Sequence, residues 1–521
     1  MLVKTYCAAI NGLEVTTVTV EISVESGQCL HLSGLGDEAV RESQSRIRTA
    51  YLYSGYKFPN KAITINLAPA DLRKEGTSFD LPIAIGILAA NEDMPKEQLD
   101  KYLLIGELGL DGTLQPIRGA LPIAIKARKD GYKGMILPRA NAREAAVVNN
   151  LEIYGMDTLA DVVQFLSGQS EVQPLEYDTR KVFYEQQASC SDLDFADVKG
   201  QESVKRAMEV AAAGGHNMIM IGPPGSGKSM MAKRLPSILP PLSLSESLET
   251  TQIHSIAGKL SGGKDGRGAT LISQRPFRSP HHTISQVALV GGGSKAMPGE
   301  ISLAHNGVLF CDELPEFNKS TLEVLRQPLE DRIITISRAK YTIEYPCSFM
   351  FVASANPCPC GYYGDPTHHC ACTPNQIQRY MNKISGPLLD RIDIQIDIVA
   401  VPFSELSKTA QGESSSEIRK RVIAARQIQT ERFKKEKAVH CNAQMTDRML
   451  RKYCAIDEQT TTLLHNAMER LHLSARAYSR ILKVARTIAD LSGSENIQMP
   501  HIAEAIGYRQ LDRGDWAERG M

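Results

Sequence analysis

An eight-residue stretch near the middle of the chain has the composition of a phosphate-binding loop. It consists of Gly222, Pro223, Pro224, Gly225, Ser226, Gly227, Lys228 and Ser229. The apolar run 218–221 precedes it and a helical pattern over 230–235 follows, which predicts a strand, a loop and a helix in that order. Glycines let backbone N–H groups turn toward phosphates, the Lys228 ammonium would bind the β- and γ-phosphates, and the Ser229 hydroxyl would bind Mg²⁺. The stretch therefore predicts a site for ATP and Mg²⁺, in preference to a glycine-rich turn without a nucleotide.

An ATP site of this kind predicts an acidic motif at the end of a neighbouring strand. The apolar run 307–311 ends in Asp312 and Glu313. Asp312 would hold Mg²⁺ through water, and Glu313 would polarise the attacking water molecule. Adjacent acidic residues also occur at helix N-termini, but the preceding phosphate loop favours the catalytic interpretation.

Two more polar residues follow further along the chain. Asn356 comes after the apolar run 349–353, where its amide could hydrogen-bond the γ-phosphate or the attacking water. The alternative for Asn356 is a turn before the proline that follows it. Arg391 stands between Asp390 and Asp393 in the stretch 386–393, which by itself indicates a surface salt bridge.

The order of these motifs resembles that of AAA+ ATPases of the magnesium-chelatase type. The resemblance to one group, the ComM/YifB family of bacterial proteins, is closer and extends over essentially the whole chain. Its residues are AAAGGHN at 211–217, RPFRSPHH at 275–282, NPCPCG at 356–361 and SARAY at 474–478. The resemblance implies that Arg391 is an arginine finger that reaches a neighbouring subunit's γ-phosphate, and that Arg476 is a sensor arginine in the helical cap. A finger that acts on a neighbour implies a homo-oligomeric ring, and we expect a hexamer.

Four cysteines are clustered in a turn-rich stretch. Cys358 and Cys360 are separated by nine residues from Cys370 and Cys372. Four thiolates on such a loop suit tetrahedral Zn²⁺, although the C-x-C spacing is tighter than the usual C-x₂-C. The alternatives are a reduced loop without metal and a labile disulfide, and two histidines at 368–369 are spare ligand candidates.

Two basic features could contact DNA phosphates. Runs at 332–336 and 341–345 flank a short turn, which predicts a hairpin with Arg338 and Lys340 at its tip. In related AAA+ motors such a hairpin projects into the ring pore, whereas the alternative is an ordinary hairpin tip that carries lysine for solubility. The stretch 419–452 carries eleven Lys/Arg residues against three Asp/Glu. It could be a solvated helix face, a DNA contact or a face against the next subunit.

The N-terminal lobe resembles the Lon protease domain, a ribosomal S5 domain 2-like fold. In that family a Ser-Lys dyad cuts peptides, and the stretch 74–78 retains a serine at Ser78. The lysine is expected at Ile123, and Lys126 lies about one helical turn further along. Because an unactivated serine is a weak nucleophile, we expect an inactive lobe that supports ring formation or substrate docking.

These residues require an α/β architecture in several parts. Strand-like alternation at 15–24 and 62–67 and helical patterns at 38–51 and 80–90 indicate a first α/β lobe. Helices alternating with short apolar strands indicate a parallel sheet in the second lobe, and 463–471, 476–491 and 502–511 have helical spacing. We expect a Lon-like domain at 1–168, a linker at 169–196, an AAA+ core at 197–401 with its cysteine loop at 358–372, and a helical lid at 402–521.

Composition excludes several classes of protein. Lys+Arg and Asp+Glu are equal at 59 each, which excludes a wholly basic DNA coat. The longest apolar run, 81–90, is far shorter than the roughly 20 residues of a membrane span. Eleven cysteines without an export signal indicate a reducing cytoplasm. A single Trp and 6% aromatic residues leave little material for an extended base-stacking surface.

Three functions remain open at this stage. The first is a cytoplasmic AAA+ ring motor on branched or single-stranded DNA, with helicase or branch-migration activity in natural transformation and recombination, as the family resemblance implies. The second is a chelatase-like ATP-driven remodeller of a protein partner that inserts metal into a tetrapyrrole. The third is an ATP-dependent protease, which requires Ser78 to find another base.

Overall fold

The computed structural model describes residues 1–521 apart from 73, 75, 189–192, 261–269, 294–295, 339–340, 366–367, 402–411, 437–438, 472 and 510–521. The contacts group the chain into two compact units. The first unit contains 1–186, 244–272 and 337–344, and the second contains 187–243, 273–336 and 345–521. Within these described ranges, none of the helices has both the length and the apolar character needed to cross a membrane.

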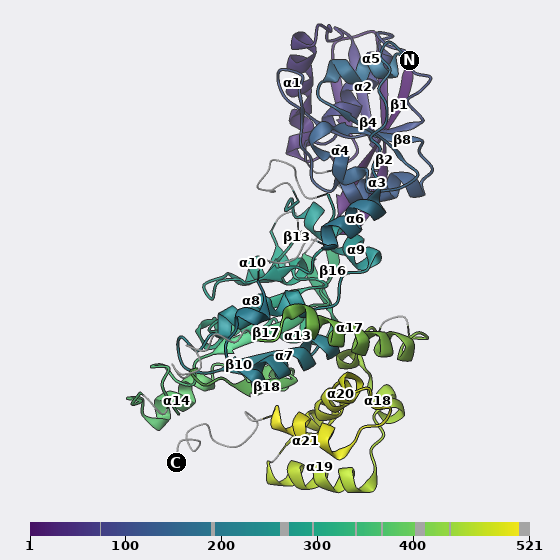
Figure 1. The fold of residues 1–521 in the computed structure, drawn as a ribbon. Coiled ribbons are helices and arrows are strands. Elements are labelled where there is room, and N and C mark those ends of the chain that lie inside the picture. Colours follow the sequence, from purple (N-terminus) through teal and green to yellow (C-terminus); the bar gives the residue numbers. More distant parts are fainter. Residues whose placement is uncertain are drawn as a thin grey trace. The chain divides into compact units, whose positions relative to one another are not determined.

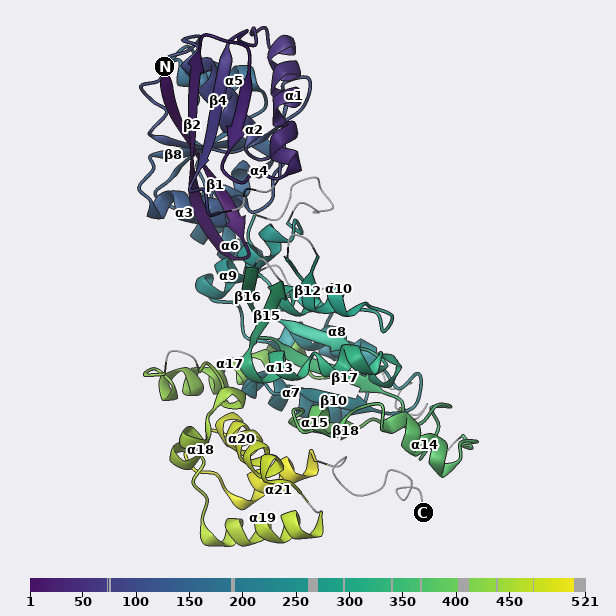
Figure 2. The same ribbon diagram turned by 180° about the vertical axis from the view of Figure 1, so that it is seen from behind.

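The first unit is built on a seven-stranded mixed sheet with strand order β3-β4-β2-β1-β5-β8-β9. β2 pairs antiparallel with β1 and β4, whereas β5, β8 and β9 are parallel; Figure 2 shows β1, β2 and β4 side by side. The strands are β1 (Leu2–Asn11), β2 (Glu14–Glu25), β3 (Leu30–Ser33), β4 (Ala62–Ala68), β5 (Tyr102–Leu104), β8 (Gly134–Pro138) and β9 (Glu152–Met156), with a small separate pair β6 (Glu107–Leu108) and β7 (Leu114–Gln115). The predicted strands at 15–24 and 62–67 are confirmed as β2 and β4.

Helix α2 forms the centre of the first unit. All eleven of its residues are buried, because the apolar run 81–90 packs between the sheet and α1 (Figure 1). Its first residue, the buried Asp80, receives a hydrogen bond from Arg46 of α1 (2.7 Å). The helices are α1 (Glu38–Tyr53), α2 (Asp80–Ala90), α3 (Ala120–Lys129), α4 (Arg139–Ala145), α5 (Leu159–Leu166), α6 (Thr179–Ala188) and α9 (Leu244–Ile256).

Two segments from the middle of the chain complete the first unit. The hydroxyl of Ser255 in α9 donates to the buried carboxylate of Glu144, and the Ser255 carbonyl accepts from Gly119 N (3.3 Å). In the segment 337–344, Ile343 is 6% exposed and lies directly against Gly12, where an added Cβ would meet its Cγ2 at 2.2 Å. Residues that follow the phosphate loop in sequence therefore belong to the unit that precedes it.

The segment 169–196, which the sequence predicts to be a linker, contains helix α6. The physical reason is one apolar anchor, Phe183, which is only 2% exposed. The Thr179 hydroxyl also donates to Val147 O (2.8 Å) and fixes the start of the helix.

The second unit contains a five-stranded parallel sheet with strand order β11-β14-β17-β10-β18. The register pairs Ile221 with Ala355 and Asp397, and Cys311 with Ala353. The carboxyl ends of the strands therefore meet at one edge, where α/β folds bind ligands. The strands are β10 (Met218–Ile221), β11 (Phe277–Arg278), β14 (Val308–Cys311), β17 (Met350–Ala355) and β18 (Ile394–Asp397), and a small antiparallel pair is β12 (Gly291–Gly292) with β13 (Met297–Pro298). A second antiparallel pair, β15 (Ile333–Arg338) with β16 (Tyr341–Pro346), is divided between the units, because residues 337–344 belong to the first unit.

The helices of the second unit surround this sheet and continue into a C-terminal helical lid. One hydrophobic cluster of buried residues runs from the strands through α7 and α8 into the lid helices. The core helices are α7 (Glu202–Gly214), α8 (Lys228–Ile238), α10 (Gln286–Val290), α11 (Glu300–Leu303), α12 (Lys319–Glu323), α13 (Arg326–Asp331), α14 (Pro374–Met381) and α15 (Gly386–Leu389). The lid helices are α17 (Ser415–Arg432), α18 (Asp447–Tyr453), α19 (Glu458–Arg470), α20 (Ala475–Leu491) and α21 (Met499–Gly507). The predicted lid helices are confirmed as α19, α20 and α21.

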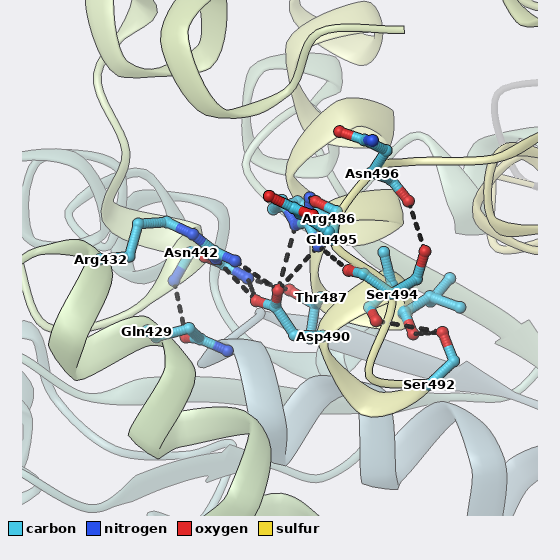
Figure 3. A network of polar contacts seen from close by, with 12 residues as sticks. Gln429, Arg432, Asn442, Arg486, Thr487, Asp490, Ser492, Ser494, Glu495 and Asn496 are labelled. Carbon is cyan, nitrogen blue, oxygen red and sulfur yellow. Dashed lines mark hydrogen bonds and ion pairs between the residues drawn. The ribbon is translucent and has the colours of Figure 1, made fainter.

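A buried polar network holds the lid helices together (Figure 3). Its centre is the Asp490 carboxylate, whose side chain is fully buried. It accepts from Arg432 (2.7 Å), Asn442 (2.8 Å) and Arg486 (3.1 Å), so that three segments of the lid meet at one charge. The two guanidinium groups carry like charges, so the carboxylate of Asp490 is needed to hold them close together.

Removing this carboxylate should therefore destabilise the second unit. Asp490→Ala leaves two partly buried guanidinium groups without their anion, and we expect a loss of about 3–5 kcal/mol in the free energy of unfolding, measured by urea denaturation. Glu469→Ala is the matched control, because the Glu469 side chain is 71% exposed and should contribute less than about 0.5 kcal/mol. Equal effects of the two substitutions would contradict the central role of Asp490.

Candidate functional site

The phosphate loop connects β10 to α8, as the sequence predicts. Gly225 and Gly227 have φ values of +77° and +90°, in the region that other residues adopt only under strain. At Gly222 the constraint is steric, because an added Cβ would lie 2.2 Å from the carbonyl oxygen of Ile398. The glycines therefore serve both the turn itself and its close approach to the segment after β18.

Lys228 is buried at the start of α8, and its ammonium group lies inside the loop. Its Nζ donates to the carbonyl oxygens of Gly222 (2.7 Å) and Pro223 (2.8 Å) and to Asn356 Oδ1 (3.2 Å). Burial lowers the pKa of Lys228, and the nearby carboxylates of Asp312 and Glu313 oppose that effect. A partly desolvated cation that contacts only neutral oxygens is well suited to receive phosphate oxygens.

Ser229 and Asp312 lie together beside Lys228. The Ser229 hydroxyl donates to Asp312 Oδ2 (2.6 Å), which places a hydroxyl and a carboxylate in the donor set that Mg²⁺ prefers. Ser354, near the end of β17, donates its hydroxyl to the other Asp312 oxygen and accepts from Glu313 N (3.1 Å). Sequence reasoning missed Ser354, although a hydroxyl two residues before Asn356 in an otherwise apolar strand was a usable signal.

Glu313 has a strained backbone and an exposed carboxylate. Its φ is +53°, and its side chain is 53% exposed, so the carboxylate is open to water. The Nδ1 atom of His282 lies 3.9 Å from Glu313 Oε2, and the His282 ring packs against His281 at 4.1 Å. The motif 275–282 therefore ends beside the predicted catalytic acid.

The two predicted arginines lie elsewhere in the second unit. Arg391, just after α15, is 12% exposed and donates to the Glu330 carboxylate and to Pro387 O (2.7 Å). Arg476, in the first turn of α20, is 63% exposed, and its Nη1 lies 3.8 Å from Asp390 Oδ2. In the described contacts, neither arginine joins the group formed by Lys228 and its neighbours.

The four cysteines converge as the sequence predicts. Their sulfur atoms lie within 4.8 Å of one another. Cys358 Sγ is 3.3 Å from Cys360 Sγ and 3.7 Å from Cys370 Sγ, whereas Zn–S bonds of about 2.3 Å place tetrahedral sulfurs about 3.8 Å apart. The donor set fits a four-thiolate Zn²⁺ site. The His368 ring stacks on Tyr362 at 4.7 Å instead.

The cysteine loop lies against the phosphate loop. Gly361 has a φ of +88°, and an added Cβ there would lie 2.6 Å from Pro224 Cδ. Cys358 also follows Asn356 by only two residues. The cluster therefore borders the predicted ATP site on both the Pro224 side and the Asn356 side.

The predicted DNA-contacting residues are described only in part. β15 ends at Arg338, of which the structure describes the backbone alone, and Lys340 lies outside the described residues. In the basic stretch 419–452, several cations are used internally: Arg421 pairs with Glu209 and Arg432 with Asp490. This stretch therefore does more than form the solvated face considered from the sequence, because α17 attaches to α7 through it.

The structure describes the positions where the Lon resemblance predicts a Ser-Lys dyad. Ile123, where the lysine is expected, is 1% exposed in α3. Lys126 makes an ion pair with Asp130 (2.6 Å) on its own helix. The Ser78 carbonyl accepts from Gly106 N (3.0 Å). In the described contacts Lys126 therefore pairs with Asp130 and not with Ser78.

Comparisons with known proteins agree with this architecture. Family models match at 194–406 (Magnesium chelatase, subunit ChlI), 19–141 (Subunit ChlI of Mg-chelatase) and 412–509 (Magnesium chelatase, subunit ChlI C-terminal). The chain is 43% identical to competence protein ComM of Haemophilus influenzae over 510 residues, which is 98% of this chain and 97% of that protein. It is 44% identical to YifB of Salmonella typhimurium over 96% of each chain. A weaker similarity, 24% over 198 residues, connects 33% of this chain with 35% of Lon protease 2 of Bacillus subtilis.

The geometry of the site predicts separable effects of two substitutions. Lys228→Ala should abolish ATP binding, because it removes the cation inside the phosphate loop. Glu313→Gln should preserve binding and lower turnover by about 10²–10⁴-fold, because the amide is too weakly basic to polarise water. Binding of a fluorescent ATP analogue and release of phosphate measure the two effects.

Glu316 provides the control for the second substitution. It lies three residues after Glu313 and pairs with Lys383 (3.6 Å), so Glu316→Gln should turn over near the wild-type rate. Wild-type turnover by Glu313→Gln itself would show that another residue activates water.

Proposed function

The chain belongs to the ComM/YifB family of magnesium-chelatase-type AAA+ ATPases, and on that premise we propose that it is an ATP-driven ring motor that acts on DNA. The observation that carries the ATPase part is the direct contact between Lys228 and Asn356 beside the Ser229–Asp312 pair. Residues from β14, β17 and the phosphate loop thereby meet at one point of the sheet edge. A nucleotide bound there would contact all three segments at once.

In this mechanism each residue of the site has a distinct task. Lys228 binds the β- and γ-phosphates, while Ser229 and Asp312 hold Mg²⁺, which when bound neutralises phosphate charge. Glu313 accepts a hydrogen bond from the attacking water and orients it. Asn356 hydrogen-bonds the γ-phosphate or that water. Ser354 keeps Asp312 and the Glu313 backbone in register.

The ring is supported by the position of Arg391. We assign this residue as the finger that reaches the neighbouring subunit's γ-phosphate, and Arg476 as the lid sensor, in a homo-hexamer. Arg391 pairs with the Glu330 carboxylate, and the Glu330 side chain is 61% exposed. A guanidinium held at an exposed carboxylate can exchange that partner for another anion. In this arrangement the AAA+ core (197–401) and the lid (402–521) act together, and the Lon-like domain (1–168), joined by 169–196, serves as a platform.

The DNA part of the proposal depends on the family. One relative is named a competence protein, and branch migration or helicase activity on branched or single-stranded DNA would serve natural transformation and recombination. The second candidate is a chelatase-like remodeller of a protein partner, favoured by the three family matches to magnesium-chelatase subunit ChlI. The two functions share the ATP site and differ in what stimulates it.

DNA stimulation separates the two candidates. With forked DNA, ATPase activity should rise in the wild type, and Arg338→Ala/Lys340→Ala should keep basal activity but lose the stimulation, because the cations that meet phosphates are gone. Binding should weaken with salt by roughly 0.7–0.9 log units per log unit of salt for each phosphate contact. Lys434→Ala/Lys435→Ala is the control, since the Lys434 side chain is 74% exposed.

The outcomes have different meanings. Equal losses from both double variants would extend the DNA path over the lid. If DNA leaves the rate of ATP hydrolysis unchanged and only a protein partner raises it, the chelatase-like function is favoured.

The four cysteines complete the proposal as a structural Zn²⁺ site. The support is the sulfur separations of 3.3–3.7 Å among Cys358, Cys360 and Cys370, together with Cys372 within the same cluster. Thiolate ligands require reduced cysteines, which agrees with the cytoplasmic location that we propose.

Metal content tests the zinc proposal. Protein purified without a histidine tag should contain about one Zn per chain by elemental analysis, and Cys358→Ser/Cys370→Ser should lose it because two of four ligands are gone. Cys29→Ser is the control, since Cys29 is an exposed cysteine outside the cluster. Reduced wild-type protein without metal would leave a thiol loop in place of a zinc site.

A further inference from the structure

The motif 211–217 ends in two residues that the proposed ATP chemistry does not use. His216 and Asn217 lie between α7 and β10, immediately before the strand that leads into the phosphate loop. The His216 side chain is fully buried, and Asn217 is partly buried. Buried polar side chains usually have hydrogen-bond partners, and each of these two residues has one on the segment 391–393.

Asn217 connects three segments of the second unit. Its Nδ2 donates to the carbonyl oxygen of Arg391 (3.1 Å), and its Oδ1 accepts from Phe351 N in β17 (3.0 Å). Its backbone N–H donates to Asp393 Oδ2 (3.2 Å). The side-chain amide of Asn217 therefore fixes the Arg391 peptide relative to β17, the strand that precedes Asn356.

Arg480 makes a second connection to the same peptide, from lid helix α20. Its Nη1 donates to the carbonyl oxygen of Arg391 (3.3 Å) and to the Asp393 carboxylate. Asp393 also lies 3.3 Å from His216 Nδ1, and His216 Nε2 lies 2.8 Å from the Thr487 hydroxyl of α20. That hydroxyl belongs to the lid network of Figure 3, where it accepts from Asn442.

The carboxyl group of Asp393 stays ionised in this group. Burial raises the pKa of Asp393, but Arg480 and His216 outweigh it, and its pKa lies far below the usual range for a carboxyl. Burial lowers the pKa of His216, while Asp393 opposes that effect, and both ring nitrogens have a hydrogen-bond partner. Asp393 thus remains an anion that holds Arg480 in place beside the Arg391 carbonyl.

We propose that Asn217 and Arg480 are positioning residues that aim Arg391 from the strand side and from the lid side. This inference rests on the proposed role of Arg391 as a finger for the neighbouring subunit. With its peptide held by two donors, Arg391 can exchange Glu330 for a phosphate by side-chain rotation alone. Because one donor is on the lid and the other is beside β10, the position of the Arg391 peptide depends on both parts of the second unit.

Mixing subunits tests the proposal. Arg480→Ala should bind a fluorescent ATP analogue like the wild type but show a roughly 10- to 100-fold lower kcat, because a misplaced catalytic group costs about that much. Lys228→Ala subunits bind no ATP but carry a correctly aimed finger. A random one-to-one mixture of the two should recover activity at about one interface in four, with co-assembly verified by capture through a tag on one subunit.

Further variants separate positioning from stability. Asn217→Ala should behave like Arg480→Ala, and Arg480→Lys should retain more activity because it keeps a donor and the charge opposite Asp393. Arg448→Ala is the control, an exposed arginine on lid helix α18 that should leave kcat unchanged.

Two results would overturn the inference in distinguishable ways. Wild-type turnover by Arg391→Ala would contradict both the finger role of Arg391 and the positioning roles of Asn217 and Arg480. Rescue of Arg391→Ala by Lys228→Ala subunits, without rescue of Arg480→Ala, would keep the finger and reject its positioning by Arg480.

Discussion

The second unit depends on one constraint, the common direction of its parallel strands. Because β10, β14 and β17 all run the same way, their carboxyl ends deliver the phosphate loop, the acidic pair and Asn356 to a single edge. Lys228 connects two of these segments, because its ammonium group donates to a loop carbonyl and to Asn356. A change of strand order would separate these groups even if every motif were intact.

The strand directions also explain where the cysteine loop and the Arg391 segment lie. β17 continues through Asn356 into the cysteine loop, and Gly361 then lies against Pro224. β18 begins just after Arg391 and Asp393, next to β10. The cysteine loop therefore lies at the edge that holds the phosphate loop, whereas Arg391 precedes β18 and lies at the opposite, amino-terminal edge of the sheet.

Local motifs were predictable from the sequence because they carry their own context. The phosphate loop between an apolar run and a helical run fixed the positions of Lys228 and Ser229, and the spacing of the cysteines indicated their convergence. Other contacts were not predictable because their partners are far apart in sequence. Arg480 meets Arg391 across 89 residues, and His216 meets Thr487 across 271. The basic composition of 419–452 likewise gave no sign that Arg421 and Arg432 neutralise acids within the same unit.

The first unit consists of three separate stretches of the chain, which affects the order in which it can fold during synthesis. A ribosome releases the chain from its N-terminus, and domains usually fold as they emerge. Here the first unit needs α9 and the segment 337–344, both encoded after the phosphate loop. Its sheet can form early. The packing of Ile343 against Gly12 and the hydrogen bond from Ser255 to Glu144 can form only after the later segments have been synthesised. The first unit is therefore completed only after the phosphate loop and the acidic pair have been synthesised. Folding of the first unit and synthesis of the second must overlap in time.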